Sequence, residues 1–455
     1  MLRLNAALRL DTFRALPRFA ALRLGAWRIM ALLPQLLAAW LLFCGAATAA
    51  GQADRLQAGV AKTDVTPAKP VTLSGYGGRN QPSQGVHDPL SARVVAFKQD
   101  GKRLVLVSTD LIGFRGETAE SARKAICTAC QLQPSELFLT AIHTHSGPSL
   151  TLGGKEAQAN NVEYTKTLQS RLVEAVREAL GRAVPAQIGA GSGSSPVGAN
   201  RRETVHDSAG KPRVQLGRNA SGLTDPEVQV LKISRAGTDE LVAVVFAYAT
   251  HSTSLGPKNY QISGDVHGLA EQFVEKYLDR GVIAPAFAGA SGDIDPWYRV
   301  LPKFETGNGW IPEPVLMGTM LGEEVVHVSG AIRQSDGRGP IKTAFKTLTL
   351  PGKPRGKAEA PADAAPVQLN LTVGRVGNVA FLGLGAEVFN EIGRVIKAAS
   401  PFKHTFVITH CNGGAGYLPT RQSNPQGGYE VLSSPFAPGA AEQVIQEAVG
   451  MLRAL

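Results

Sequence analysis

The chain has 455 residues, of which 44% are hydrophobic and 18% are charged, so it can bury a large core and is not a disordered protein. Its formal net charge is +10, but residues 1–50 hold six arginines and one aspartate and therefore carry half of that charge. The rest is spread over about 400 residues without a basic run, which argues against a nucleic-acid partner.

The N-terminal segment has the pattern of a secretory signal peptide. After Arg28 the sequence IMALLPQLLAAWLLF forms a short apolar stretch, and the small residues of CGAATAA suit cleavage near Ala47–Ala50. The stretch is short for a membrane span and is interrupted by Pro34 and Gln35. We therefore expect residues 1–50 to be removed and residues 51–455 to form a single domain that is secreted or periplasmic.

The remainder of the chain alternates short apolar runs with amphipathic segments. This alternation predicts an α/β fold in which mixed β-sheets are flanked by helices. Cys127 and Cys130 are spaced either for a local disulfide or for two ordinary small residues near a helix end, and the sequence leaves both readings open. Helices are expected at 116–131, 161–182, 267–280, 314–333, 387–400 and 438–454.

Six apolar runs end at a polar residue that is followed by a turn. In open α/β sheets, ligands bind beyond the carboxyl ends of the strands. Six such endings together therefore predict a shared polar site. The final residues of the runs are Asp110, His143, His251, Asp293, Glu387 and the pair His410 and Asn412.

The run LFLTAIHTHSGP ends in a His-x-His pair. Alternation along a strand would place His143 and His145 on the same side, unless the turn at Ser146 and Gly147 begins earlier. Neutral imidazole is a common zinc ligand. With His251 and Glu387 at comparable strand ends, the pair favours a metal site. Asp293 and Asp295 of GDIDP are candidates to bind metal, to orient a histidine, to act as acid and base or to stabilise a turn.

A second aspartate-containing segment, SGDVHGLAEQF, resembles one signature of the calcineurin-like metallophosphoesterases. The chain has no Gly-Asn-His block and no second Gly-Asp-x-x-Asp-Arg block. We therefore expect Asp265 to cap the helix that begins near His267. A two-metal phosphoesterase that uses Asp265 and Asp293 stays open as an alternative.

A set of motifs in chain order resembles the catalytic domain of the neutral/alkaline non-lysosomal ceramidases. The motifs are AGVAKTDVTP, GYGGRNQPSQGVHDPL, TAIHTHSGPS, GANRRE, ATHSTS, GDIDP, GLGAEVFN and CNGGAGYLPT, and they cover nearly all of the chain after residue 50. The resemblance implies that water activated at a single zinc ion cleaves the amide bond of an N-acyl lipid such as ceramide, which gives sphingosine and a fatty acid.

The resemblance also implies roles for individual residues. It places His145, Arg201 and Tyr429 at the reaction centre, and it puts His87 in another recurrent block with a less defined role. Asp295 stands where the family has a serine regarded as catalytic, and an ionised carboxylate cannot donate a hydrogen bond as a hydroxyl does. The implied zinc ligands are His143, His251, Glu387 and Tyr417.

Two further expectations concern the extent of the chain and its partners. Ceramidases of this family carry a C-terminal immunoglobulin-like domain, so we expect this chain, which ends at Leu455, to hold the catalytic domain without it. The expected partner is a small-molecule or lipid substrate, with peripheral membrane contact and no nucleic acid, while the oligomeric state is not indicated. Two other functions stay open: hydrolysis of a different amide or an ester at the same zinc site, and a catalytically silent zinc-binding homologue.

Overall fold

The computed structural model describes residues 55–297, 313–333, 340–353 and 364–455. The expected signal peptide at residues 1–50 lies outside the described residues. The helices begin and end within a few residues of the expected bounds, with α8 as an addition. They are α3 (Gly116–Cys130), α4 (Ala159–Gly181), α5 (Asp265–Leu278), α6 (Glu313–Ala331), α7 (Asn390–Ala399), α8 (Tyr429–Ser433) and α9 (Ala440–Arg453), with short 3-10 helices η1 (Pro134–Glu136) and η3 (Arg421–Gln426).

The largest sheet has eight strands and is antiparallel except at its two edges. Its strands are β1 (Gln57–Asp64), β2 (Ser91–Gln99), β3 (Lys102–Thr109), β4 (Leu137–Leu139), β5 (Val184–Ser194), β8 (Glu227–Arg235), β9 (Leu241–Tyr248) and β10 (Ala286–Ala288). Their spatial order is β10-β9-β8-β5-β1-β2-β3-β4. The edge pairs β3–β4 and β9–β10 are parallel.

Three smaller sheets complete the described strands. The four-stranded sheet contains β12 (Ile341–Leu350), β13 (Val367–Val376), β14 (Val379–Leu384) and β16 (His404–Ile408), and its β14–β16 pair is parallel. A three-stranded sheet joins β6 (Gly198–His206), β7 (Pro212–Asn219) and β11 (Ile294–Pro296). A two-stranded sheet pairs β15 (Glu387–Val388) with β17 (Tyr417–Leu418).

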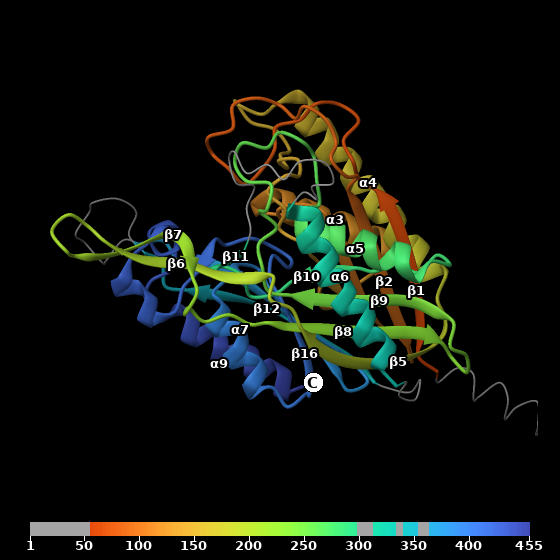
Figure 1. Cartoon of the computed structure of the whole chain (residues 1–455). Coiled ribbons are helices and arrows are strands. Elements are labelled where there is room, and N and C mark those ends of the chain that lie inside the picture. The colour runs from red at the N-terminus through yellow and green to blue at the C-terminus, as the bar shows by residue number, and fades with distance from the viewer. Residues whose placement is uncertain (1–54, 298–312, 334–339, 354–363) are drawn as a thin grey trace, which may run out of the picture. The chain divides into compact units, whose positions relative to one another are not determined.

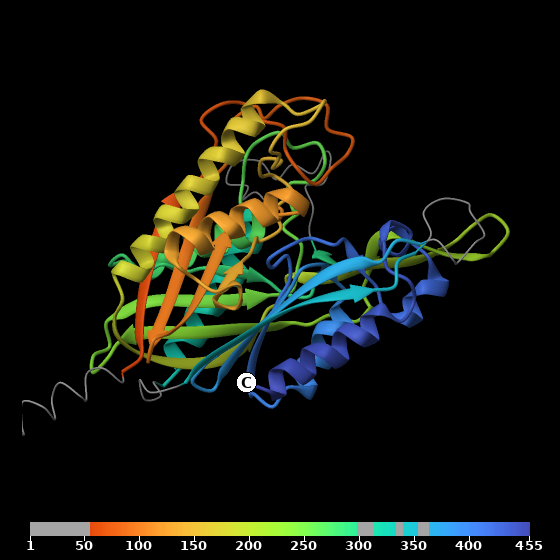
Figure 2. The same cartoon turned by 180° about the vertical axis from the view of Figure 1, so that it is seen from behind.

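The two large sheets pack face to face, and helices cover their outer sides (Figures 1 and 2). Because side chains alternate along a strand, each face of a sheet carries every second residue. On β2, Val95 faces the core between the sheets with Phe381 of β14, whereas Val94 faces the core under α3 and α4. Phe246 of β9 packs under α5 and α6, and α7 and α9 cover the four-stranded sheet. The predicted α/β fold with mixed sheets is confirmed.

The two edges of the eight-stranded sheet end at the same place. The residues that follow β4 and β9 pair through a parallel bridge between Thr144 and Ser252. The segment after β16 is hydrogen-bonded to both edges. The backbone amide of Thr409 donates to the carbonyl oxygen of Ala288, the last residue of β10, and the backbone amide of Asn412 donates to the carbonyl oxygen of Leu139 in β4. The carboxyl ends of β4, β9, β10 and β16 therefore converge.

The CxxC segment has no disulfide in this structure. Cys127 and Cys130 lie in the last turn of α3, and both are free. Cys130 packs in the core beneath the helix. Within the part of the chain that the structure describes, no helix combines the length and the apolar character that a bilayer span requires.

A buried ion cluster ties α5 to the eight-stranded sheet. The guanidinium of Arg93 on β2 lies 3.3 Å from the carboxylate of Asp110, 2.5 Å from that of Glu271 and 2.7 Å from that of Glu275. Burial raises the pKa of Asp110 and raises the pKa of Glu271 well above its usual value. Glu271 therefore binds a proton more tightly in the folded chain than in the unfolded chain.

We expect Glu271→Gln to change the pH dependence of stability. Because the folded pKa of Glu271 lies above the unfolded value, its contribution to the free energy of unfolding is present at low pH and is lost as pH rises through the folded pKa. Each pKa unit corresponds to about 1.4 kcal/mol. Urea unfolding between about pH 5 and pH 9 should show a smaller loss of stability in the variant than in the wild type. The control is Glu240→Gln, at an exposed ion pair, whose free energy of unfolding should follow the wild-type dependence on pH. The same dependence in Glu271→Gln would contradict the prediction.

Candidate metal centre

Three buried histidines meet where the strand ends converge. The ligand atoms of His143, His145 and His251 all lie within 4.8 Å of one another. Nε2 of His145 is 3.4 Å from Nε2 of His143, and the ring centroids of His143 and His251 are 4.7 Å apart. The first two follow β4 and the third follows β9, so the strand-end pattern predicted where His143 and His251 lie.

The chain reaches this cluster through a turn and not along a strand. β4 ends at Leu139, and His143 has a φ of 62°, in the left-handed region that side-chain-bearing residues rarely adopt. The turn therefore begins before Ser146, which is the exception to strand alternation that the sequence leaves open, and both rings still reach the same cluster. The ring of His143 is held by its Nδ1, 2.7 Å from the carbonyl oxygen of Ile112, and by stacking on His410 at 3.8 Å between centroids.

Glu387 brings a carboxylate to the histidines. Its Oε2 lies 3.4 Å from Nε2 of His143 and 3.7 Å from Nε2 of His251. Burial opposes ionisation of Glu387, whereas a positive charge on the histidine side of the carboxyl, where His143 lies, lowers its pKa well below the usual range. The buried Oε2 atom has no hydrogen-bond donor, so nothing in the protein satisfies this side of the carboxylate.

Backbone carbonyls orient two of the three imidazoles. Nδ1 of His251 is 2.8 Å from the carbonyl oxygen of Ser291. His143 makes the same kind of bond with its own Nδ1, to the carbonyl oxygen of Ile112. An Nδ1–H that donates to a carbonyl leaves the Nε2 lone pair available, which is the usual arrangement of metal-binding histidines. His145 differs, because its buried Nδ1 has no partner. Burial and the neighbouring His143 lower the pKa of His145 well below its usual value, so its ring is neutral at pH 7.

These donors fit a metal ion. The unsatisfied Oε2 of Glu387 and the oriented Nε2 atoms of His143 and His251 face one common space. Imidazole and carboxylate ligands suit zinc and also other transition metals, so this donor set alone does not identify the ion. The cluster could therefore bind a metal whose identity the geometry leaves open.

Tyr417 lies beside Glu387 because β15 and β17 are paired. The register of the two-stranded sheet sets Glu387 opposite Tyr417. Burial, together with the Glu387 carboxylate, raises the pKa of Tyr417 well above its usual value. The hydroxyl oxygen accepts a hydrogen bond from Nη2 of Arg201 at 3.1 Å. The four residues that the resemblance implied as ligands are therefore neighbours in space.

Arg201 borders the cluster and is held by two carboxylates. Its Nη1 lies 3.1 Å from Oδ1 of Asp295 and 3.3 Å from Nε2 of His251, and its Nε lies 2.7 Å from Oε1 of Glu430. The other carboxylate oxygen of Asp295 accepts from Arg218 at 3.4 Å. Asp295 is thus buried in an ion-pair network at the position where the resemblance places a serine.

The cluster opens into a pocket of about 630 Å³. His143, His145, Glu387 and Tyr417 form part of its wall. Tyr429, at the start of α8, is 49% exposed at this pocket, and its ring meets that of Tyr417 edge-on at 5.6 Å. Two of the residues expected at the reaction centre, His145 and Tyr429, therefore share this cavity with three candidate ligands, whereas Arg201 and His251 lie behind its wall residues.

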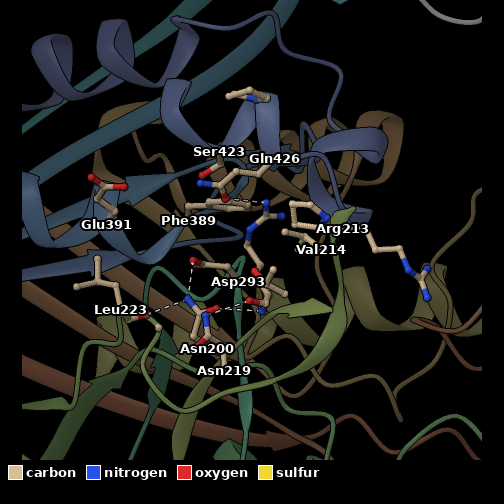
Figure 3. A pocket seen from close by; sticks show the side chains of 15 residues that line it. Asn200, Arg213, Val214, Asn219, Leu223, Asp293, Phe389, Glu391, Ser423 and Gln426 are labelled. Atoms are coloured by element: carbon tan, nitrogen blue, oxygen red, sulfur yellow. Dashed lines mark hydrogen bonds between the residues drawn. The ribbon is translucent and has the colours of Figure 1, made fainter. Parts of the chain in front are cut away.

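A second pocket of about 540 Å³ does not include the histidines (Figure 3). It lies between the β6–β7 hairpin, the start of α7 and the η3 region, and Asn200 and Asp293 are among the side chains at its wall. The carboxylate of Asp293 accepts from the backbone amide of Asn390 and from Asn200, and burial raises the pKa of Asp293 to about 6. Asp293 therefore supports the start of α7 and is not a member of the histidine cluster.

Two other predicted positions also lie elsewhere in the fold. The cap position of α5 is Gly264 and not the expected Asp265, but the carboxylate of Asp265 accepts the first-turn amide of Val266 as well as the amides of Ser254 and Leu255. Asp265 and Asp293 thus have separate backbone partners and, among the described residues, form no joint metal site. His87 pairs with Asp88 at 2.6 Å, and this hydrogen bond raises the pKa of His87.

Sequence reasoning missed two residues of the site, Arg115 and Glu430, and gave no role to a third, His410. Arg115, at the start of α3, places its Nη2 2.7 Å from Oε1 of Glu387. Glu430 bridges Arg201 and Arg202 with its two oxygens. His410, which stacks on His143, had been marked by the strand-end pattern without a role, whereas no local pattern marks Arg115 or Glu430.

Fold and site together define a mixed α/β domain with a buried imidazole–carboxylate cluster at the ends of its strands. The model of the neutral/alkaline non-lysosomal ceramidase N-terminal domain matches residues 56–296. The chain belongs to this family, as its sequence motifs predict.

Relatives and a solved structure agree with this assignment. The chain is 27% identical over 264 residues to the neutral ceramidase of Pseudomonas aeruginosa, a match that covers 54% of this chain and 37% of that protein. It is 26% identical over 245 residues to the neutral ceramidase of Mycobacterium tuberculosis, with 49% and 37% covered. These matches span little more than a third of the relatives' length. The crystal structure of the Pseudomonas neutral ceramidase covers 88% of this chain and 75% of its own, with a TM-score of 0.72 at 20% identity, and shows a shared fold.

We expect the purified protein to bind one transition-metal ion per chain and His143→Ala to lose it. Loss of a hydrogen bond that supports a metal ligand lowers metal affinity by up to about 100-fold. Loss of a ligand itself should therefore lower the affinity by more than this. Metal content after dialysis, measured by mass spectrometry, checks this. His327→Ala, at an exposed histidine of α6, should retain the metal. Equal metal content in the two variants would contradict the assignment.

Proposed function

We propose that this protein is a zinc-dependent hydrolase that cleaves the amide bond of an N-acyl lipid, with ceramide as the first substrate to test. One observation carries the proposal: a buried carboxylate oxygen of Glu387 without a donor lies between the Nε2 atoms of His143 and His251. Membership of the ceramidase family supports the reaction class, and the names of the relatives support the substrate.

The ion is assigned to His143, His251 and Glu387, with Tyr417 as the fourth residue beside Glu387. When bound, zinc would lower the pKa of a water molecule and polarise the scissile carbonyl group. The two histidines suit this role because backbone carbonyls fix their tautomers.

His145 is assigned to proton transfer. Its ring is neutral, lies at the cluster, and has no carbonyl that fixes a tautomer at Nδ1. Such a ring can accept a proton at Nε2 and pass it to the leaving amine. The ring packs against the backbone at Gly75, where a Cβ would lie 2.4 Å from the imidazole, so only glycine leaves room for the ring there.

Arg201 and Tyr429 are assigned to stabilising negative charge on the carbonyl oxygen. The guanidinium of Arg201 is held in place by Asp295 and Glu430, and its fixed positive charge beside the cluster would stabilise such an oxyanion. Asp295 acts here as a positioning residue, since its own oxygens meet Arg201 and Arg218. We further propose, on the sequence of residues 1–50 alone, that the protein acts outside the cytoplasm.

A hydrolysis screen tests the proposal. The purified protein should release fatty acid from ceramide and other N-acyl amides, and a chelator should abolish this activity until zinc is added back. Phosphoesters should not be cleaved. Activity that resists the chelator, or that survives in His143→Ala, would refute a metal mechanism. Preference for esters would support the same site with another substrate, and zinc binding without turnover of any acyl compound would support the silent homologue.

Arg201→Lys should lower kcat by roughly 10²- to 10³-fold, the range for loss of one oxyanion donor. Lysine keeps the charge but cannot reach Asp295, Glu430 and Tyr417 together as the planar guanidinium does. Metal content should not change. Arg202→Lys is the matched control, because Arg202 pairs with the far oxygen of Glu430 and lines the second pocket. Equal losses in the two variants would contradict a role of Arg201 at the reacting carbonyl.

A further inference from the structure

We infer that Arg115 recognises a carboxylate on the substrate, so that the preferred substrates are N-acyl compounds with a carboxylate a few bonds from the scissile amide, such as N-acyl amino acids. This inference rests on the proposed amidohydrolase function and narrows its substrate class. It is carried by the position, the exposure and the single partner of one arginine.

Arg115 reaches the edge of the metal cluster while half of its side chain stays open. Its Nη2 donates to Oε1 of Glu387 at 2.7 Å, and the exposed fractions of the two side chains are 50% and 6%. Among the residues that the structure describes, the guanidinium has no other hydrogen-bond acceptor. Arg115 also lines the pocket above the cluster. The unused N–H groups are therefore available to a ligand in that pocket.

The pocket has an excess of positive charge once a metal is bound. Glu387 is the one acid among the described residues that line it, against two arginines, Arg79 and Arg115. The guanidinium of Arg79 donates to the carbonyl oxygens of Ser74, His145 and Gly256 and, within the described part of the chain, to no carboxylate. A divalent cation on Glu387 would therefore leave a field that favours an anionic ligand.

The geometry favours an anion close to the scissile bond. The two oxygens of Glu387 face Arg115 and the histidine cluster respectively, so the guanidinium is one carboxylate group away from the reaction centre. A carboxylate on the carbon next to the amide nitrogen lies within a few bonds of the scissile carbonyl. The flat edge of a guanidinium matches such a carboxylate with two parallel N–H groups.

A purely structural role of Arg115 predicts a different outcome. If Arg115 only balanced the charge of Glu387, its loss would disturb the metal site and lower turnover of every substrate alike. If Arg115 binds a substrate carboxylate, its loss changes the ratio of the kcat/KM values for substrates with and without that carboxylate. The ratio, together with the metal content, separates the two roles.

N-lauroylglycine and N-lauroylethanolamine provide the test, because they differ in having a carboxylate or a neutral hydroxymethyl group. The zinc-loaded wild type should cleave N-lauroylglycine with a kcat/KM at least about tenfold higher. Arg115→Gln should lower kcat/KM for N-lauroylglycine about 10- to 100-fold more than for N-lauroylethanolamine, mainly through KM, so that the preference is lost. Arg115→Lys should restore part of the preference. Arg235→Gln, at an exposed arginine–glutamate pair, is the matched control and should change neither value.

Each remaining outcome decides between the two proposals. An equal loss of kcat/KM on both substrates in Arg115→Gln would overturn the inference. A wild-type preference for N-lauroyl-O-phosphoethanolamine over N-lauroylglycine would also overturn it, because the recognised group would then be a phosphate. Both outcomes leave the amidohydrolase function intact. If no amide is cleaved, the proposed function fails, and calorimetric binding of N-lauroylglycine to the zinc-loaded protein decides the inference alone. Binding that is lost in Arg115→Gln supports it, and binding that is unchanged overturns it.

Discussion

The site depends on a carboxylate that is buried and yet ionised. Taking such a group out of water costs several kcal/mol unless other charges or dipoles replace the solvent. Glu387 has Arg115 on one oxygen and two imidazole nitrogens near the other. Burial lowers the pKa of His143, so this imidazole offers a lone pair and no charge. The positive charge missing on the Oε2 side is the charge that a metal ion would bring.

The backbone carries local strain to bring these groups together. His143, His410 and Asn412 all have positive φ angles, which cost about 1–3 kcal/mol each for residues other than glycine. Contacts made by the same residues compensate for that cost. His410 stacks on His143, and the side-chain amide of Asn412 bonds to the backbone of β4 at Leu137 and Leu139. The segment after β16 therefore holds the edge strand and the cluster with one set of interactions.

Local patterns predicted the helices and the strand ends because both follow from short-range periodicity. They could not show which strand ends meet: Asp110 ends its strand as expected but pairs with Arg93 instead of joining the histidines. Arg115 left no signal, because its partner Glu387 is 272 positions away and the contact forms only in the folded chain. Tyr417 was found by family resemblance alone, since the two-residue strands that place it beside Glu387 are too short for any periodicity.

The neighbours of Asp295 determine what this residue can do. It is 1% exposed, and its two oxygens meet Arg201 and Arg218. Asp295 and Glu430 together hold the guanidinium of Arg201. A serine at this position would take one of two carboxylates from Arg201, so the aspartate changes the support of the arginine as well as removing a hydroxyl from the site.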